Sequence, residues 1–243
     1  GFLGGVGYGD QQWMIGAFGG WLDTRQSIAP LAASTRADGV VAGVHGRYTM
    51  PNGFGFGASV IYDGAQARTT RALPGTASGF GRYDLHSWTS DLSIHYTAEM
   101  ADGWALTPRA GLTYLRTTRA GVGETGGSPF ALSVAKDRHV AGFADGGLTL
   151  GRSDTSDAPF RPFVTLGARY QIEGNRALAL GGYAGGGLGL VALGAQRAPL
   201  VGTATAGVAY RFANGVDLYA TGSAQTGRDD HQETIAAGLR LRF

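Results

Sequence analysis

The chain has no cysteine among its 243 residues, and only 16% of the residues are charged. Without cysteine it can form neither a disulfide nor a thiolate metal site. Lysine is almost absent too, since Lys136 is the only lysine among twenty basic residues. This excess of arginine is more typical of fixed, multidentate side-chain networks than of the solvated, lysine-rich surface of a soluble protein. The formal net charge of +2 is too small to indicate nucleic acid, and we expect no such partner.

A membrane-spanning helix is also missing from the sequence. The nearest candidate, 177–195, is uncharged and mostly apolar, but seven of its residues are glycine, which disfavours a helix. We therefore expect a Gly-rich loop with flanking strand ends there. No basic region precedes an apolar core at Gly1, so no signal peptide is visible. We expect a mature fragment or a chain whose beginning is missing.

What the sequence contains instead is alternation with a period of two. Residues 235–243, IAAGLRLRF, place apolar side chains at every odd position and Gly or Arg at 238, 240 and 242. Successive strand residues point to opposite faces, so one face is apolar and the other is basic. The alternation alone does not say which face meets water.

The same pattern recurs along the chain in segments of about ten residues, the length that a tilted strand needs to cross a bilayer. The clearest segments are 40–48, 54–62, 88–99, 104–114, 140–150, 164–172, 208–212 and 216–223. The polar face of these segments carries charges of both signs, which could pair with one another and still hydrate a polar chain in a lumen. The inward charged residues that we expect are Arg47, Asp63, Asp91, His95, Glu99, Arg109, His139, Asp145, Arg169, Arg211, Asp217, Arg240 and Arg242.

Connections between the segments alternate in length. Short turns are predicted at 10–11, 51–53, 101–103 and 213–215, with a middling one at 153–159; several contain Asn-Gly or Asp-Gly, which favour hairpins. Longer links are predicted at 24–37, 64–79, 118–129 and 173–199, with a short last one at 227–230. This alternation indicates an up-and-down outer-membrane barrel with tight periplasmic turns and larger extracellular loops.

Aromatic residues support the same interpretation. One group lies beside the short turns, and a second lies nearer the opposite strand ends, as two interfacial girdles require. The first group is Trp13, Tyr48, Phe54, Trp104, Tyr210, Phe212 and Phe243, and the second is Trp21, Tyr62, Trp88, Tyr114 and Tyr170. A soluble β-sandwich is the alternative, but its strands would be shorter, about 5 to 6 residues.

Eleven strands can be counted from Phe2 onward, so the first and the last run in the same direction. Bacterial single-chain barrels have even strand numbers and close antiparallel. We expect one strand before Gly1 to be missing, which gives twelve in the parent protein. A ten-stranded barrel in which residues 1–9 form no strand is the alternative.

Two segments, 106–114 (LTPRAGLTY) and 160–168 (FRPFVTLGA), together with the last strand, resemble the carboxy-terminal translocator domain of autotransporters, the type V secretion proteins. The resemblance runs from about Tyr83 to the end. It implies one domain, 1–243, that forms a twelve-stranded barrel in a bacterial outer membrane. Neither the family's first strand nor its lumen helix is visible before Gly1.

The resemblance also implies function and partners. An upstream passenger of the same polypeptide would cross to the cell surface and be secreted or anchored there. The assembly machinery of the outer membrane would read the terminal strand, which assigns that role to Leu239, Leu241 and Phe243. The lipid bilayer is the remaining partner.

Two other functions stay open. A passive pore would use the same barrel without a passenger. A barrel enzyme would need a catalytic site such as Asp84 with His86 or Asp230 with His231 near loop ends, but no serine motif accompanies them. No His, Asp or Glu cluster has metal-ligand spacing. We therefore expect no enzyme, metal or cofactor.

Overall fold

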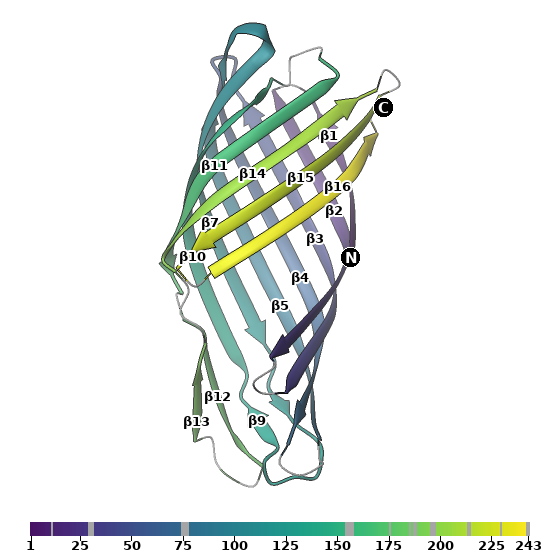
Figure 1. Ribbon diagram of the computed structural model, residues 1–243, viewed down its shortest axis with the longest axis vertical. Coiled ribbons are helices and arrows are strands. Elements are labelled where there is room, and N and C mark those ends of the chain that lie inside the picture. Colours follow the sequence, from purple (N-terminus) through teal and green to yellow (C-terminus); the bar gives the residue numbers. More distant parts are fainter. Residues whose placement is uncertain are drawn as a thin grey trace.

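The computed structural model describes residues 1–10, 12–28, 32–73, 78–153, 158–174, 176–184, 186, 189–194, 198–212, 215–228 and 230–241. Its main feature is one curled antiparallel sheet (Figure 1). The strands of this sheet, in spatial order, are β1 (Phe2–Gly9), β2 (Trp13–Ile28), β3 (Ala33–Thr49), β4 (Phe54–Ala72), β5 (Ser78–Tyr96), β7 (Trp104–Arg119), β10 (Asp137–Arg152), β11 (Phe160–Glu173), β14 (Leu200–Arg211), β15 (Val216–Gly227) and β16 (Asp230–Leu241). A short twelfth strand, β6 (Ala98–Glu99), pairs with β7.

The two faces of this sheet differ as the alternation predicts. Along β5, exposed residues alternate with half-buried ones, and the exposed members include Leu92 (62%) and Ile94 (54%). Asp91 and Ser93, on the other face, are half-buried. The convex face of a curled sheet is the more exposed one, so the apolar side chains point outward and the polar ones inward.

Every strand of the main sheet pairs antiparallel with its sequence neighbour, and the short connections all lie at one end. Gly53 and Gly215 adopt left-handed backbone angles in two of the short turns (φ 88° and 80°), which glycine accepts without steric cost. A third turn contains a 3₁₀ helix, η2 (Ala101–Gly103), in which Asp102 is also left-handed (φ 58°). Parts of the predicted turns and of the last link, at 11, 154–157, 213–214 and 229, lie outside the described residues.

Two of the predicted long links are wrong. β2 and β3 remain paired as far as Ile28 with Ala33, and β4 and β5 as far as Ala72 with Ser78, so 24–37 and 64–79 are mostly strand. The polar and Gly-rich composition that suggested loops reflects strand residues outside the membrane, where the outer face has become polar.

The links 118–129 and 173–199 contain strands of a second sheet. Its strands are β8 (Val122–Gly123), β9 (Leu132–Val134), β12 (Leu178–Tyr183) and β13 (Leu190–Leu193), in the order β13-β12-β9-β8. A bridge between Phe80 and Thr125 joins this sheet to β5. Within the apolar segment 177–195, β12 and β13 pair with one another, so strand extends further into it than the predicted Gly-rich loop with flanking strand ends. In Figure 1 this sheet lies at the lower end, beside the ends of the longest main strands.

The main sheet has two free edges, β1 and β16, which run in the same direction. Residues 2–9 pair with β2 over their whole length, from Phe2 with Trp21 to Gly9 with Met14, so the ten-stranded alternative is wrong. Within the described part of the chain, no helix is long and apolar enough to cross a membrane.

Candidate functional site

The inner face of the curled sheet carries the charged residues that the sequence singled out. The ladder register shows this directly, because partners on neighbouring strands share a face: Asp145 stands opposite Arg169, and Asp217 stands opposite both Arg211 and Arg240. By the same pairing and alternation, Arg47, Asp63, Asp91, His95, Glu99, Arg109 and His139 also belong to this face. Arg242 and Phe243 lie outside the described residues.

One ion network occupies the middle of this face. Arg109 on β7 lies between two carboxylates, 3.2 Å from Asp91 on β5 and 3.6 Å from Asp145 on β10. Thr113 donates a hydrogen bond of 2.9 Å to the second oxygen of Asp91. Three adjacent strands are thereby cross-linked by charge, and a half-exposed guanidinium faces the lumen.

A second network lies near the short-turn end. Asp217 on β15 is buried and contacts two arginines, Arg211 at 3.4 Å and Arg161 at 3.6 Å. Arg161 belongs to β11, two strands away from β15. The contact therefore passes over the intervening strand β14, and the concave curvature of this face shortens the span that the two side chains must cover.

Two further inward groups, Glu99 and Arg169, have contacts of their own with the wall. Ser153 donates a hydrogen bond of 2.6 Å to Glu99, and the Arg169 guanidinium lies 5.7 Å from the ring centre of Phe143. Opposite hydroxyls also pair, with 2.8 Å between Thr149 and Thr165. The inner surface is therefore polar, and many of its charged and hydroxyl groups are paired with one another.

Sequence reasoning missed Arg161 and Phe143 as inward residues. Arg161 precedes Arg169 by eight residues, an even spacing that puts both on one face of β11, but the strand was predicted to begin at 164. Phe143 precedes Asp145 by two, although a register shift between Gly142 and Phe143 interrupts the alternation just before it.

The outer face presents an apolar surface with aromatic residues at both ends. At the short-turn end, Phe54 and Tyr96 have ring centres 4.8 Å apart, and Tyr210 and Phe212 likewise. At the other end, Tyr62 packs against Trp88 at 4.9 Å. The distance between these levels along β4, from Phe54 to Tyr62, is nine residues, which matches a bilayer-spanning strand.

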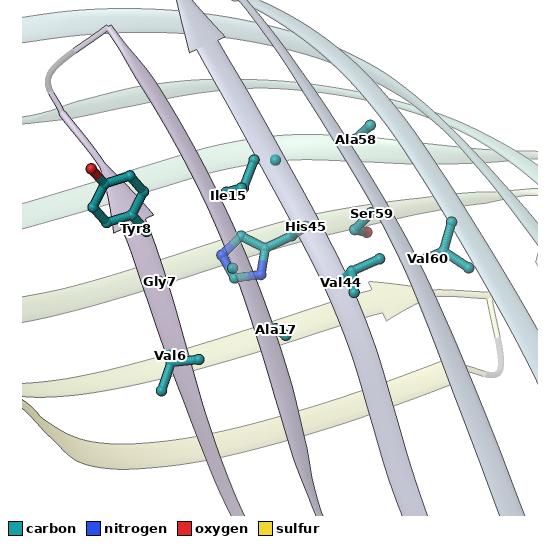
Figure 2. A pocket seen from close by; sticks show the side chains of 12 residues that line it. Val6, Gly7, Tyr8, Ile15, Ala17, Val44, His45, Ala58, Ser59 and Val60 are labelled. Carbon is teal, nitrogen blue, oxygen red and sulfur yellow. The ribbon is translucent and has the colours of Figure 1, made fainter.

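An open depression of about 640 Å³ lies on this outer face over β1 to β4. Figure 2 shows the side chains around it, and the outward ones are Val6, Tyr8, Ile15, Ala17, Val44, Ala58 and Val60. His45 and Ser59 appear there too, but the alternation assigns them to the inner face. Its outward lining is apolar apart from the Tyr8 hydroxyl, so the depression belongs to the apolar outer face of the sheet.

The histidines considered for catalysis have other contacts. His86 Nδ1 lies 2.8 Å from the Tyr62 hydroxyl, while Asp84 accepts a hydrogen bond from Gln66 at 3.5 Å. His231 lies 3.2 Å from Glu233. Across the described residues, no group of three or more His, Asp or Glu side chains could hold a metal ion.

Three comparisons with known proteins bear on this arrangement. The family model described as "Autotransporter beta-domain" matches residues 1–223. A search of curated proteins returned no match.

Several solved structures share the fold. The translocator domain of the autotransporter NalP from Neisseria meningitidis has a TM-score of 0.80 at 16% identity, covering 99% of this chain and 79% of that one. The β domain of the Bordetella autotransporter BrkA has a TM-score of 0.69 at 17% identity, covering 99% and 90%. The transport unit of AIDA-I from Escherichia coli has 0.67 at 14%, covering 99% and 80%.

Translocator domains of this family are not enzymes, and membership implies a passenger on the same polypeptide. With an antiparallel barrel wall, an apolar outer face and a family match over most of its length, the chain belongs to the autotransporter β-domain family and is an outer-membrane translocator domain of a Gram-negative bacterium.

Proposed function

We propose that the inner face of this barrel is the conduit along which the passenger crosses the outer membrane, with no chemistry performed by the barrel itself. The observation that carries this is the Asp91–Arg109–Asp145 network. Paired charges offer a polar chain a hydrated surface, but they hold it weakly because each charge already has a partner. A surface of this kind favours transit over tight binding.

The absence of cysteine allows a clean test in cells. A passenger stalled during secretion and carrying one cysteine should form a disulfide with the barrel variant Ser93→Cys, whose side chain faces inward. Leu92→Cys is the matched control, because the adjacent residue faces lipid and is 62% exposed. Crosslinking of Leu92→Cys in preference to Ser93→Cys would contradict a luminal route.

We also propose that one further antiparallel strand, contributed by sequence before Gly1, fills the gap between β1 and β16. The support is geometric, since two edges running in the same direction accept a single antiparallel strand and the total becomes even. A disulfide between Gln232→Cys on β16 and a cysteine in that upstream segment would support this pairing. Direct crosslinking between β16 and β1 would contradict it.

We propose that the outer-membrane assembly machinery reads the outward side chains of β16. Leu239 and Leu241 stand opposite Leu218 and Val216 and are more than half exposed. The variant Leu239→Ala/Leu241→Ala should lose barrel insertion in cells but still fold when purified into detergent micelles. Arg240→Gln, on the inward face, is the control and should insert normally. Equal insertion of the unaltered protein, the double variant and Arg240→Gln would overturn this role.

A further inference from the structure

Four arginines stand directly opposite one another on the outer face of β2 to β5, beyond the aromatic residues. The ladder pairs Arg25 with Arg36, Arg36 with Arg68, and Arg68 with Arg82. Directly opposite residues have Cβ atoms about 4.5–5.5 Å apart, and like charges in that position are destabilising. Such a row needs anions to offset it.

Acidic side chains compensate only one end of the row. Arg36 contacts Asp23 at 2.6 Å and Asp38 at 3.2 Å, and Arg25 lies 3.9 Å from Asp23. Burial raises the pKa of Asp23, but hydrogen bonds from Arg36 and the charge of that guanidinium outweigh it and hold the pKa below its ordinary value. The Asp23 carboxylate therefore stays ionised at this end of the row and offsets the arginine charges.

Arg68 and Arg82, at the other end, have no such partner. Both are exposed, and neither forms an ion pair or hydrogen bond with any residue that the structure describes. Two acids stand opposite Gln66 on this face, one on each side: Asp84 accepts a hydrogen bond from Gln66, and Asp38 contacts Arg36. Two guanidinium groups on neighbouring strands are thus left facing solvent together.

The space between them is a depression of about 610 Å³. Arg68 and Arg82 line it together with Thr70, Thr125 and Phe80. The arginines and the Thr70 hydroxyl are donors, whereas the Thr125 hydroxyl donates to the Phe80 carbonyl. The Phe80 side chain, 53% exposed, gives one apolar flank. The lining therefore combines donors for an anion with a surface for a less polar neighbouring group.

The position of the depression limits what can reach it. Arg82 lies six residues beyond Trp88 along β5, which at about 3.3 Å per residue and a tilt of about 40° is roughly 15 Å outside the aromatic level. It also faces away from the lumen. The groups available there are those attached to the heads of outer-leaflet lipids or dissolved near them, not a chain in transit.

We propose that Arg68 and Arg82 form a binding site for a phosphate group carried on a sugar at the membrane surface. Guanidinium groups bind phosphate oxygens through paired, charge-assisted hydrogen bonds, and a phosphate between the two arginines would also offset their repulsion. Thr70 supplies a further donor, and Phe80 contacts the sugar. This site is separate from passenger translocation and does not depend on it.

The test measures binding to the whole chain in phosphatidylcholine nanodiscs by calorimetry, in phosphate-free buffer. The probes are glucose 6-phosphate, glucose and inorganic phosphate, and a second series adds lipopolysaccharide before and after enzymatic dephosphorylation. The variant is Arg68→Gln/Arg82→Gln, and Arg25→Gln is the matched control from the compensated end of the row. Heat-modifiable migration on gels verifies that each protein is folded.

We expect glucose 6-phosphate to bind the unaltered chain and Arg25→Gln within twofold of each other, and the double variant at least tenfold more weakly. Preference for phosphorylated over dephosphorylated lipopolysaccharide would identify a lipid headgroup as the source of the sugar phosphate and supports the site. Binding of inorganic phosphate as tight as that of glucose 6-phosphate would show that the sugar is not recognised and would overturn the assignment to a sugar phosphate. Equal affinity of the double variant, equal weakening in Arg25→Gln, or equally tight binding of glucose would overturn the site.

Thermal unfolding gives an independent readout. Without phosphate, the double variant should unfold at the same or a higher temperature than the unaltered chain, because a like-charge contact has been removed. Glucose 6-phosphate should raise the unfolding temperature of the unaltered chain only. A rise of the same size in the double variant would contradict the proposal.

Discussion

Leu166 and Thr165 are neighbours in sequence that meet different surroundings. Leu166 is 62% exposed on the lipid-facing surface, while the Thr165 hydroxyl lies 2.8 Å from that of Thr149 on the inner face. The difference follows from the two-residue repeat of a strand. At the residue scale, the side that a side chain occupies determines which substitutions the barrel tolerates.

Placing a charge at Leu166 should therefore destabilise the barrel. Leu166→Arg puts a guanidinium into hydrocarbon, and the free energy of unfolding in lipid vesicles should fall by about 2–4 kcal/mol if the site lies near the bilayer midplane. Ser223→Arg, on the inner face of β15, is the control and should cost much less. Similar losses in both variants would show that the face assignment is wrong.

A second residue-scale prediction concerns Glu124, which lies outside the membrane. Arg71 contacts it at 2.7 Å, and the Leu132 amide donates a hydrogen bond of 2.9 Å. Burial raises the pKa of Glu124, but these hydrogen bonds and the Arg71 charge outweigh it, so the pKa lies below the ordinary 4.5. A lowered pKa means stabilisation that is complete above the unfolded-state value and lost as the pH falls through the folded-state value.

Hydrogen exchange at the Phe80 and Thr125 amides should report this directly, because both take part in the bridge beside Glu124. Protection is expected to be constant above about pH 5 and to fall as the pH drops below the ordinary Glu value. Glu124→Gln should remove most of this pH dependence. An unchanged profile in that variant would assign the effect to another carboxylate.

At the element scale, close packing between strands depends on glycine at particular ladder positions. Phe163 on β11 stands opposite Gly207 on β14 on the inner face. A Cβ atom added at Gly207 would lie 2.6 Å from the Phe163 ring and 2.8 Å from the Thr221 methyl group. The ring therefore occupies the space above the glycine backbone and covers the junction of these strands.

Gly207→Ala should then destabilise the barrel by about 1–3 kcal/mol through overpacking. Urea unfolding in lipid vesicles measures the loss. The double variant Gly207→Ala/Phe163→Leu should recover part of it, because the smaller side chain makes room for the added methyl group. If the double variant loses at least as much unfolding free energy as the two single variants lose together, the contact between the ring and the glycine is not the cause.

At the scale of the whole molecule, the charge networks determine how open the lumen is to ions. A barrel of about twelve strands has a lumen between the filled interior of eight strands and the aqueous channel of sixteen. Opposite charges that pair along one wall of this lumen, as in the Asp91–Arg109–Asp145 network on β5, β7 and β10, leave few unpaired charges there to attract ions.

Single-channel recording of the closed parent barrel should therefore show low conductance. Arg109→Ala should raise the conductance or its fluctuations, because Asp91 and Asp145 lose their shared partner. Large, stable currents in the unaltered protein would instead favour a passive pore.

Much of the wall could be predicted from sequence, because a lipid-facing strand must alternate along its whole length. The segments 213–215 and 101–103 indicated turns through their Asn-Gly and Asp-Gly content, and the alternation separated Leu166 from Thr165 and Leu218 from Asp217. The strand ends were less predictable. Outside the membrane the outer face of β2 to β5 changes from apolar to charged, so the alternation that identifies a strand inside the bilayer no longer marks it.

By itself, then, the sequence determined the antiparallel order of the strands, the direction in which each strand runs and the two chemically different faces of the sheet. These features follow from local periodicity and from the connections between strands. Only the tertiary structure decided that Arg161 reaches Asp217 across an intervening strand, that the apolar segment 177–195 folds into a second sheet, and that Arg68 meets Arg82 without a counter-charge. Such contacts depend on strand register and sheet curvature, which bring together residues that are far apart in sequence. No local sequence pattern specifies which of these residues meet.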